Sequence, residues 1–159
     1  MTVTARRVDY HVESDRKNLI LLMDEYAKFE LGDDRRDFQS LPDQLIKFPT
    51  AFSVLGFADD SEAQAVGLVN CMFGFSTFMG KQLVNIHDAI VTETHRGQGV
   101  VNIMLEEVER IAREAGCCRL TLEVYEDNTP ARRAYAKNGF TGDPVHPDVH
   151  TLFLRKLLE

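Results

Sequence analysis

Residues 94–116 combine a short basic loop that contains two glycines with a long amphipathic stretch. Arg96, Gly97 and Gly99 lie in the loop, directly before that stretch. The N-terminus of a helix presents free backbone N–H groups at the positive end of its dipole, and glycine lets this backbone approach a ligand closely. A phosphate or pyrophosphate is therefore the expected ligand, although a glycine before a helix can also be only a turn.

Two common phosphate-binding motifs do not match this loop. The dinucleotide fingerprint needs a third glycine three residues after the second, but Gly99 is followed by Val100, Val101 and Asn102. No Gly-Lys-Ser/Thr sequence follows the loop, which argues against a P-loop. A different phosphate-bearing cofactor is therefore required, and a dinucleotide-dependent oxidoreductase is disfavoured.

The rest of the chain predicts the elements that position this loop. Strands precede, separate and follow helices, which is typical of an α/β domain with a mixed sheet, and no linker divides the chain, so we expect one domain over 1–159. The expected strands are 4–12, 51–58, 63–77, 82–92, 118–126 and 149–157. The expected helices run from Ser14 to Gly32, over 41–48 with Pro42 near the start, over 101–115, and from Thr129 as cap to Asn138.

The helix over 101–115 has the clearest pattern. We expect Gly116 to end it and two i,i+4 ion pairs to support it, Glu106 with Arg110 and Glu109 with Arg113. Its apolar stripe, which should face the sheet, consists of Val101, Met104, Leu105, Val108, Ile111, Ala112 and Ala115.

Composition limits the classes of partner. The chain has 159 residues, of which 44% are hydrophobic and 27% charged, with a net charge of −7 and a pI of about 5.2. This acidic balance disfavours nucleic acid and mildly favours a cationic substrate. We find neither an apolar run of about 20 residues nor a signal-peptide core. Because Cys71, Cys117 and Cys118 show no metal spacing and no paired framework, we expect reduced thiols in a cytoplasmic protein, with no membrane contact and no metal.

The order of motifs over residues 85–140 resembles the GCN5-related N-acetyltransferase (GNAT) family. Arg96-x-x-Gly99 follows a strand and opens a helix, "LTLEV" comes next, and "NTPARRAYAKNGF" occupies 128–140. The resemblance implies a single-domain GNAT-like fold, in which a mixed, mostly antiparallel sheet with splayed central strands is flanked by helices. It also implies acetyl-CoA as co-substrate, with its pyrophosphate on the backbone amides of "RGQG" and its pantetheine along the preceding strand. The implied contacts are Ile90, Val91, Thr92, Arg96, Gly97, Gln98, Gly99, Val100, Val101, Asn128 and Tyr135.

The chain departs from the family pattern at one position. The family usually has Gly or Ala two residues after the second glycine, and here Val101 stands there. Because Val101 fits the apolar stripe of the helix, we interpret it as tolerated packing rather than as a broken cofactor site.

Acetyl transfer to an amine needs two proton movements, because the ammonium loses a proton and the departing thiolate gains one. The resemblance suggests Tyr135 as the acid, and the alternative is a packing tyrosine. On the 82–92 strand, His87 is a plausible base, since an imidazole can accept a proton near neutral pH, and the carboxylate of Asp88 is a plausible anchor for a cation. In relatives that resemble polyamine acetyltransferases a Glu–Asp pair occupies this place. Neighbours on a strand point to opposite faces, so only one of the two lines the cleft unless a bulge intervenes.

Several other residues have weaker claims to the site. Glu123 is more simply a solvated strand residue, and the acidic run of Glu30, Asp33 and Asp34 is more simply a polar loop. Cys117 and Cys118 look structural, which favours direct transfer in a ternary complex over a cysteine intermediate. Most of the phenylalanines of 71–81 are expected on a covered sheet face, and the alternatives are a pocket wall or a dimer contact.

These inferences predict an acetyl-CoA-dependent N-acetyltransferase that acts on a primary amine of a small molecule. A non-catalytic acyl-CoA-binding sensor and a protein N-acetyltransferase stay open as alternatives, and neither the amine nor the oligomeric state follows from the sequence. Relatives in this family are commonly dimers, so a homodimer is one expected assembly.

Overall fold

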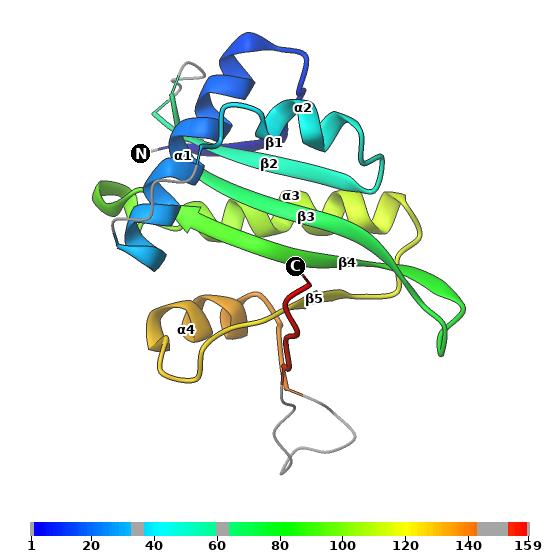
Figure 1. Ribbon diagram of the computed structural model, residues 1–159. Coiled ribbons are helices and arrows are strands. Elements are labelled where there is room, and N and C mark those ends of the chain that lie inside the picture. Colours follow the sequence, from blue (N-terminus) through cyan, green and yellow to red (C-terminus); the bar gives the residue numbers. More distant parts are fainter. Residues whose placement is uncertain (1, 33–36, 60–63, 143–152, 159) are drawn as a thin grey trace. The chain divides into compact units, whose positions relative to one another are not determined.

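The computed structural model describes residues 2–32, 37–59, 64–142 and 153–158 (Figure 1). These fall into two compact parts, Met1–Glu123 and Val124–Glu159. Among the described residues, the larger part holds the sheet and three α-helices, and the smaller holds one α-helix. The single domain expected over 1–159 stays a prediction.

The larger part is built on one five-stranded sheet with the strand order β1-β2-β3-β4-β5. Its strands are β1 (Val3–Arg7), β2 (Ala51–Ala58), β3 (Ala65–Ser76), β4 (Lys81–Val91) and β5 (Leu120–Leu122). The first four strands pair antiparallel in chain order, and β5 pairs parallel with β4. This is the mixed, mostly antiparallel sheet that the sequence predicted.

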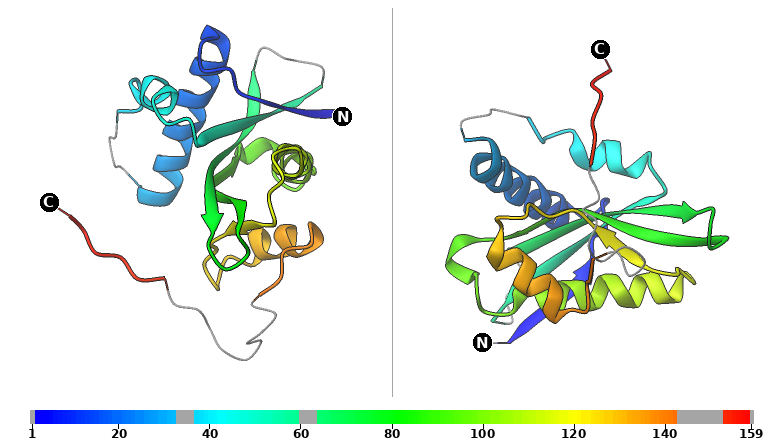
Figure 2. Two further views of the ribbon diagram at one scale, coloured as in Figure 1. Left: turned by 90° about the vertical axis from the view of Figure 1, so that its right-hand side faces the viewer. Right: turned by 90° about the horizontal axis from the view of Figure 1, so that it is seen from below.

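Helices cover both faces of this sheet, as the left view of Figure 2 shows. Helices α1 (Glu13–Leu31) and α2 (Leu41–Ile46) pack on one face, and α3 (Val100–Glu114) packs on the other. Because both faces are covered, every residue of β2 is buried. No helix in the described ranges is long and apolar enough to cross a membrane.

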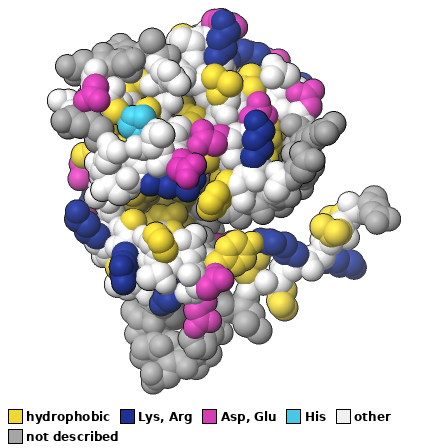
Figure 3. Space-filling model, turned by 90° about the vertical axis from the view of Figure 1, so that its left-hand side faces the viewer, with side chains coloured by type: hydrophobic (Ala, Val, Ile, Leu, Met, Phe, Trp, Pro, Cys, Tyr) yellow, Lys and Arg dark blue, Asp and Glu magenta, His cyan; other side chains and the backbone are white. Residues whose placement is uncertain are grey.

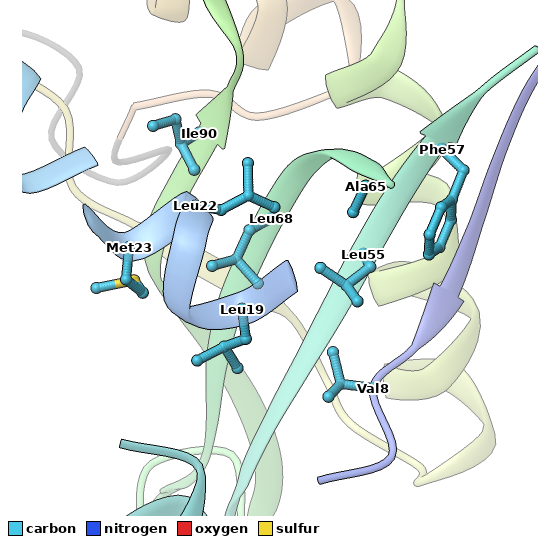
Figure 4. Packing of buried hydrophobic residues seen from close by; sticks show 9 residues of the cluster. All are labelled: Val8, Leu19, Leu22, Met23, Leu55, Phe57, Ala65, Leu68 and Ile90. Carbon is cyan, nitrogen blue, oxygen red and sulfur yellow. The ribbon is translucent and has the colours of Figure 1, made fainter. Parts of the chain in front are cut away.

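The face under α1 holds an apolar cluster whose side chains come from α1 and three strands, together with Val8 just after β1 (Figure 4). Because side chains alternate along a strand, this cluster shows which strand residues point toward α1. The residues drawn are Val8, Leu19, Leu22, Met23, Leu55, Phe57, Ala65, Leu68 and Ile90.

The opposite face accepts α3 at two glycines that sequence reasoning did not identify. A Cβ built on Gly56 would lie 2.9 Å from Sδ of Met104, and one built on Gly67 would lie 2.7 Å from its Cε. Either Cβ would also lie 3.1 Å from Cγ1 of Val100. Gly56 and Gly67 are register partners on β2 and β3, so together they form a flat place on which the first turns of α3 rest.

Strands 51–58, 63–77 and 82–92 were predicted to within two residues at each end. Gly32 and Gly116 follow their helices with positive φ, as expected. The predicted strand 4–12 was too long, because the chain leaves β1 after Arg7 and the Asp9 N–H then donates to Asp15. The predicted strand 118–126 was also too long, since only Leu120–Leu122 pairs with β4.

Predicted helix details were wrong at several points. Helix α1 begins at Glu13 with Val12 at the N-cap, so Ser14 is not the cap. The buried stripe of α3 begins at Val100 rather than Val101, and Ala115 is exposed beyond the helix end. Arg110 pairs with Glu107 and Glu114 rather than Glu106, whereas the expected pair of Glu109 with Arg113 is present.

The smaller part contains α4 (Thr129–Lys137). Its cap is Asn128 rather than the predicted Thr129, since Oδ1 of Asn128 accepts the N–H of Ala131 at 3.3 Å. Of the predicted last strand, residues 153–157 form no strand, and 149–152 lie outside the described residues.

Candidate active site

The loop between β4 and α3 has the backbone that the sequence predicted. A short 3₁₀ turn (Glu93–His95) follows β4, and Gly97 and Gly99 then adopt φ values of 73° and 85°. Gly99 is the N-cap of α3 and has no side chain to satisfy the first N–H groups of the helix. A Cβ at either glycine would meet no atom within 4 Å, so backbone conformation, not crowding, calls for glycine here.

This loop presents a run of unused backbone donors. The first helical hydrogen bonds are those from the N–H groups of Asn102 and Ile103 to the carbonyl of Gly99, at 3.1 and 3.4 Å. Within the described ranges, no acceptor takes the backbone N–H of any residue from 97 to 101. Donors of this kind at the positive end of a 15-residue helix form a site suited to a phosphate or pyrophosphate.

Side chains within the loop hold its shape. Arg96 donates from Nε to the carbonyl of Val91 at 3.0 Å, and its guanidinium lies 4.7 Å from the ring centroid of Phe29 on α1. Gln98 donates from Nε2 to the carbonyl of Thr94 at 2.8 Å. These contacts fix the loop without using the N–H groups of residues 97–101.

The strand edge before the loop is open. Strand β3 pairs with β4 as far as Val91, but β5 pairs only with Val84–Ile86. From residue 87 to 91, the edge of β4 that faces away from β3 therefore has no strand partner among the described residues of the larger part. This is the splay between central strands that the sequence predicted, and it leaves backbone groups available to an extended ligand.

The residues expected along this edge differ in what they offer. Ile90 points its side chain into the cluster under α1 (Figure 4), and its backbone faces β3, since Thr92, two residues later, donates its N–H to that side. The Val91 carbonyl already accepts from Arg96. Thr92 donates its N–H to Val66, and its hydroxyl lies 2.9 Å from Nδ1 of His95. The structure therefore does not place the side chain of any of these three residues for contact with a cofactor.

A β-bulge lies at the two residues expected to serve the acceptor. Asn70 is opposite Asp88 and Cys71 is opposite Ile86, so His87 is the extra residue of β4. Ile86 consequently shares a face with Cys71, while Asp88 shares the α1 face with Asn70. His87 is exposed and Asp88 half-buried. The sequence allowed His87 and Asp88 both to line the cleft only if a bulge intervened, and this bulge is present.

Asp88 is bonded to residues that sequence reasoning missed. Its Oδ2 accepts a hydrogen bond from Nδ2 of Asn70 at 3.0 Å, and Oδ1 of Asn70 accepts from Oγ of Ser53 at 2.6 Å. These side chains come from β4, β3 and β2. Only the strand register brings them together, and the chain carries no local pattern that would have identified them.

Asn128 and Tyr135 lie in the smaller part, and their place near the thioester stays a prediction. Burial raises the pKa of Tyr135, so its hydroxyl stays protonated at neutral pH, as an acid requires. Its ring meets Phe140 edge-on, with 5.8 Å between ring centroids. This contact also fits the alternative of a packing tyrosine.

The three cysteines are free thiols. Burial, together with the nearby charge of Asp88, raises the pKa of Cys71 far above its usual value. Burial also raises the pKa of Cys117, with its neighbour Cys118 adding to the shift. A thiol with a raised pKa is a poor nucleophile at neutral pH, which agrees with the expected direct transfer.

Other expectations have mixed outcomes. Glu123 is exposed at the end of the larger part. Asp33, Asp34 and the side chain of Glu30 lie outside the described residues. Phe73 packs on Phe52, with 4.9 Å between ring centroids. The expectation that most phenylalanines of 71–81 are covered was wrong, because the far end of the β3–β4 hairpin leaves Phe75 62% and Phe78 97% exposed.

A separate cleft of about 470 Å³ lies beside the loop, between α1, the start of β3 and the 3₁₀ turn. Its lining includes Glu25, Thr92 and His95, but neither Asp88 nor residues 97–101. On the face drawn in Figure 3, acidic and basic side chains are interspersed, and no large area carries lysine and arginine alone.

The fold and the loop define the class of protein, and comparison with known proteins gives the family. The model of the Acetyltransferase (GNAT) family matches residues 19–140. The chain belongs to this family.

Two curated relatives are similar over part of their length. A streptothricin acetyltransferase of Streptomyces lavendulae is 35% identical over 86 residues, which are 52% of this chain and 46% of that protein. A streptothricin acetyltransferase of Escherichia coli is 37% identical over 59 residues, which are 37% of this chain and 34% of that protein. The chain thus spans less than half the length of the curated relatives it matches.

Solved structures share the fold over nearly the whole chain. A ribosomal-protein-alanine N-acetyltransferase from Brucella melitensis biovar Abortus 2308 has a TM-score of 0.76 at 17% identity, covering 98% of this chain and all of that one. An aminoglycoside acetyltransferase from an uncultured soil metagenomic sample, in complex with sisomicin, has a TM-score of 0.78 at 15% identity, covering 97% of each chain. At these identities the likeness shows the fold alone.

Proposed function

We propose that this chain transfers the acetyl group of acetyl-CoA to a primary amine of a small molecule by direct attack in a ternary complex. The observation that carries the proposal is the run of backbone N–H groups at residues 97–101, which have no acceptor in the described part of the chain. The open edge of β4 leads directly into this run. A pyrophosphate on the loop and a pantetheine along the edge match these two features in order.

The residues of the site have separate tasks in this proposal. The loop amides of residues 97–101 bind the pyrophosphate, and Gly97 and Gly99 give it access to the backbone. A backbone N–H group near Ile90 or Val91 polarises the thioester carbonyl, in the manner of an oxyanion hole, and that of Val91 faces the open edge. The Val101 side chain is partly buried, which supports the interpretation of this departure from the family pattern as packing.

The acetyl transfer forms one bond, breaks another and is accompanied by two proton transfers. The amine nitrogen forms a bond to the acetyl carbon, and the carbon–sulfur bond breaks. His87, exposed at the bulge, receives the proton that the attacking ammonium loses, directly or through water. Tyr135 gives its proton to the departing thiolate, and Asp88 anchors the positive charge of the acceptor.

The acceptor tested first is streptothricin, because both curated relatives carry that name. The experiment incubates the protein with acetyl-CoA and each of a panel of amines, with streptothricin, an aminoglycoside, a polyamine and a peptide among them. Mass spectrometry then identifies the N-acetylated product. Acetylation of a small amine supports the proposal, acetylation of the peptide alone favours a protein N-acetyltransferase, and acetyl-CoA binding without any product favours a sensor.

A further inference from the structure

A line of polar side chains crosses the apolar face under α1. It runs from Tyr10, just after β1, through Ser53 on β2 and Asn70 on β3 to Asp88 on β4. The hydroxyl of Tyr10 lies 2.9 Å from Oγ of Ser53, Oγ of Ser53 lies 2.6 Å from Oδ1 of Asn70, and Nδ2 of Asn70 lies 3.0 Å from Oδ2 of Asp88. We call these four residues the polar line.

Each hydrogen bond in the polar line has one direction. A carboxylate only accepts, so the Asn70 amide nitrogen faces Asp88 and its oxygen faces Ser53. That oxygen also only accepts, so Ser53 donates to Asn70 and in turn accepts from Tyr10. Burial raises the pKa of Tyr10, which keeps its hydroxyl protonated for this donation.

The Asn70 amide is fully used by its neighbours. Its Nδ2 also lies 3.2 Å from Sδ of Met23 on α1. The amide therefore has contacts on three sides, to β2, β4 and α1, and cannot rotate without breaking one of them. It holds one oxygen of Asp88 in a fixed place.

The other oxygen of Asp88 remains available. Among the described residues no hydrogen bond reaches Oδ1, while Oδ2 accepts from Asn70. The side chain is only half-buried. Because of the bulge at His87, Asp88 points to the α1 face beside Asn70, not to the α3 face with Ile86.

Stability alone does not account for polar residues at these positions. Ser53 is 1% exposed, and its neighbours Val54 and Leu55 are fully buried, as are Leu68 and Val69 beside Asn70. Polar groups in such surroundings cost free energy unless they are hydrogen-bonded, and an apolar side chain avoids the requirement. Departures of this kind from an apolar core occur most often at functional sites.

We propose that Asn70 is a positioning residue for Asp88, so that Oδ1 of Asp88 receives an N–H of the cationic acceptor amine, with Ser53 and Tyr10 holding Asn70 from behind. This inference rests on the proposed function and adds the way in which the acceptor is recognised. Asn70 does not relay a proton, because a carboxamide has no group that titrates near neutral pH. The polar line thus orients the acceptor, and the transfer of its proton falls to another group.

The test compares Asn70→Ala, Asp88→Ala and the double variant, with streptothricin and acetyl-CoA as ligands. We expect each single change to raise the KM for the amine about tenfold, as the loss of a charge-assisted contact does, and the Kd for acetyl-CoA to change less than about twofold. The double variant should resemble Asp88→Ala, since Asn70 acts through Asp88. Ser53→Ala should raise the KM for the amine less than Asn70→Ala does, and Tyr10→Phe should raise it less again.

Asn85→Ala is the matched control, because Asn85 lies on β4, the strand of Asp88, but donates its hydrogen bond to Thr121 on β5. It should leave the KM for the amine unchanged. Additive effects of Asn70→Ala and Asp88→Ala, or an unchanged amine KM in Asn70→Ala, would overturn the inference.

Failure of the proposed function is recognised separately, by a wild-type protein that releases no coenzyme A with any amine. Calorimetric binding of streptothricin then judges the inference. Weaker binding by both single variants supports it, whereas equal binding by Asp88→Ala, or no binding by the wild type, overturns it.

Discussion

Gly67 on β3 lies directly beneath Met104 of α3, so closely that a Cβ on Gly67 would lie 2.7 Å from Cε of that methionine. Val100, one turn earlier, lies 3.1 Å from the same point. The N-terminal turns of α3, which carry the unused N–H groups, therefore rest on backbone rather than on side chains. The distance of these N–H groups from the sheet depends on this contact.

Gly67→Ala is accordingly expected to lower the free energy of unfolding by about 1–3 kcal/mol, as overpacking of a filled core does. Gly142→Ala serves as control, because Gly142 has no atom within 4 Å of an added Cβ and no positive φ. Urea unfolding of both variants makes the comparison. Equal stability of the two variants would show that α3 can move away from the sheet without cost.

Gly99→Ala separates the cofactor role of the loop from its stability. Alanine at a φ of 85° is strained by about 1 kcal/mol, and relief of this strain would turn the backbone N–H groups of the loop away from their present directions. Acetyl-CoA affinity should fall at least tenfold by calorimetry. Gly80→Ala carries a similar strain in the β3–β4 turn, at a φ of 62°, and should lose stability but no affinity. An equal loss of affinity in both variants would contradict the assignment of the loop.

Tyr135→Phe tests the proposed acid. The ring and its contact with Phe140 remain, while the proton donor is lost, so kcat should fall about 100-fold with little change in the Kd for acetyl-CoA. Tyr125→Phe is the control, because Tyr125 is 65% exposed in the same part of the chain. Unchanged turnover in Tyr135→Phe would leave Tyr135 as a packing residue.

Asp15 links stability to pH. Burial alone would raise the pKa of its carboxyl, but hydrogen bonds from Arg6, 2.7 Å to each oxygen, and from the Asp9 N–H together hold the pKa below its usual value. A carboxyl with a lowered pKa in the folded state stabilises the protein above the unfolded pKa of about 3.9, and this stabilisation is lost as the pH falls through the lower folded value.

Asp15→Asn should therefore lower the free energy of unfolding by about 2 kcal/mol at pH 7. The change replaces one of the two carboxylate oxygens that accept hydrogen bonds from three donors. The difference from wild type should shrink between pH 4 and the acid limit of folding. Denaturant titrations at several pH values measure it, and a difference that stays constant with pH would show that Asp15 contributes no charge-dependent stability.

The sequence predicted the features that depend on local chemistry. Gly97 and Gly99 before a helix indicated free N–H groups. The pattern of apolar residues predicted the bounds of three central strands to within two residues. The resemblance added the splay between strands. Errors arose at helix starts, where the cap differed by one or two residues: Val12 caps α1 without a polar side chain, and Asn128, not Thr129, accepts from the first turn of α4.

The polar line could not be predicted, because its four residues are joined by strand register and by a bulge. Asn70 and Asp88 are 18 positions apart, and Ser53 and Asn70 are 17 apart. A strand without the bulge at His87 would place Asp88 on the same face as Ile86. The role of Gly56 and Gly67 could not be predicted either, because it depends on the packing of α3 against the sheet.

Release of free coenzyme A from acetyl-CoA, separated by chromatography, tests the central claim most directly. Chromatography avoids thiol dyes, which the three cysteines would also reduce. The account predicts release that depends on a primary amine, is strongest for a cationic small molecule such as streptothricin, and is lower in Gly99→Ala when acetyl-CoA is limiting. Tight acetyl-CoA binding with no release across the whole amine panel would contradict it.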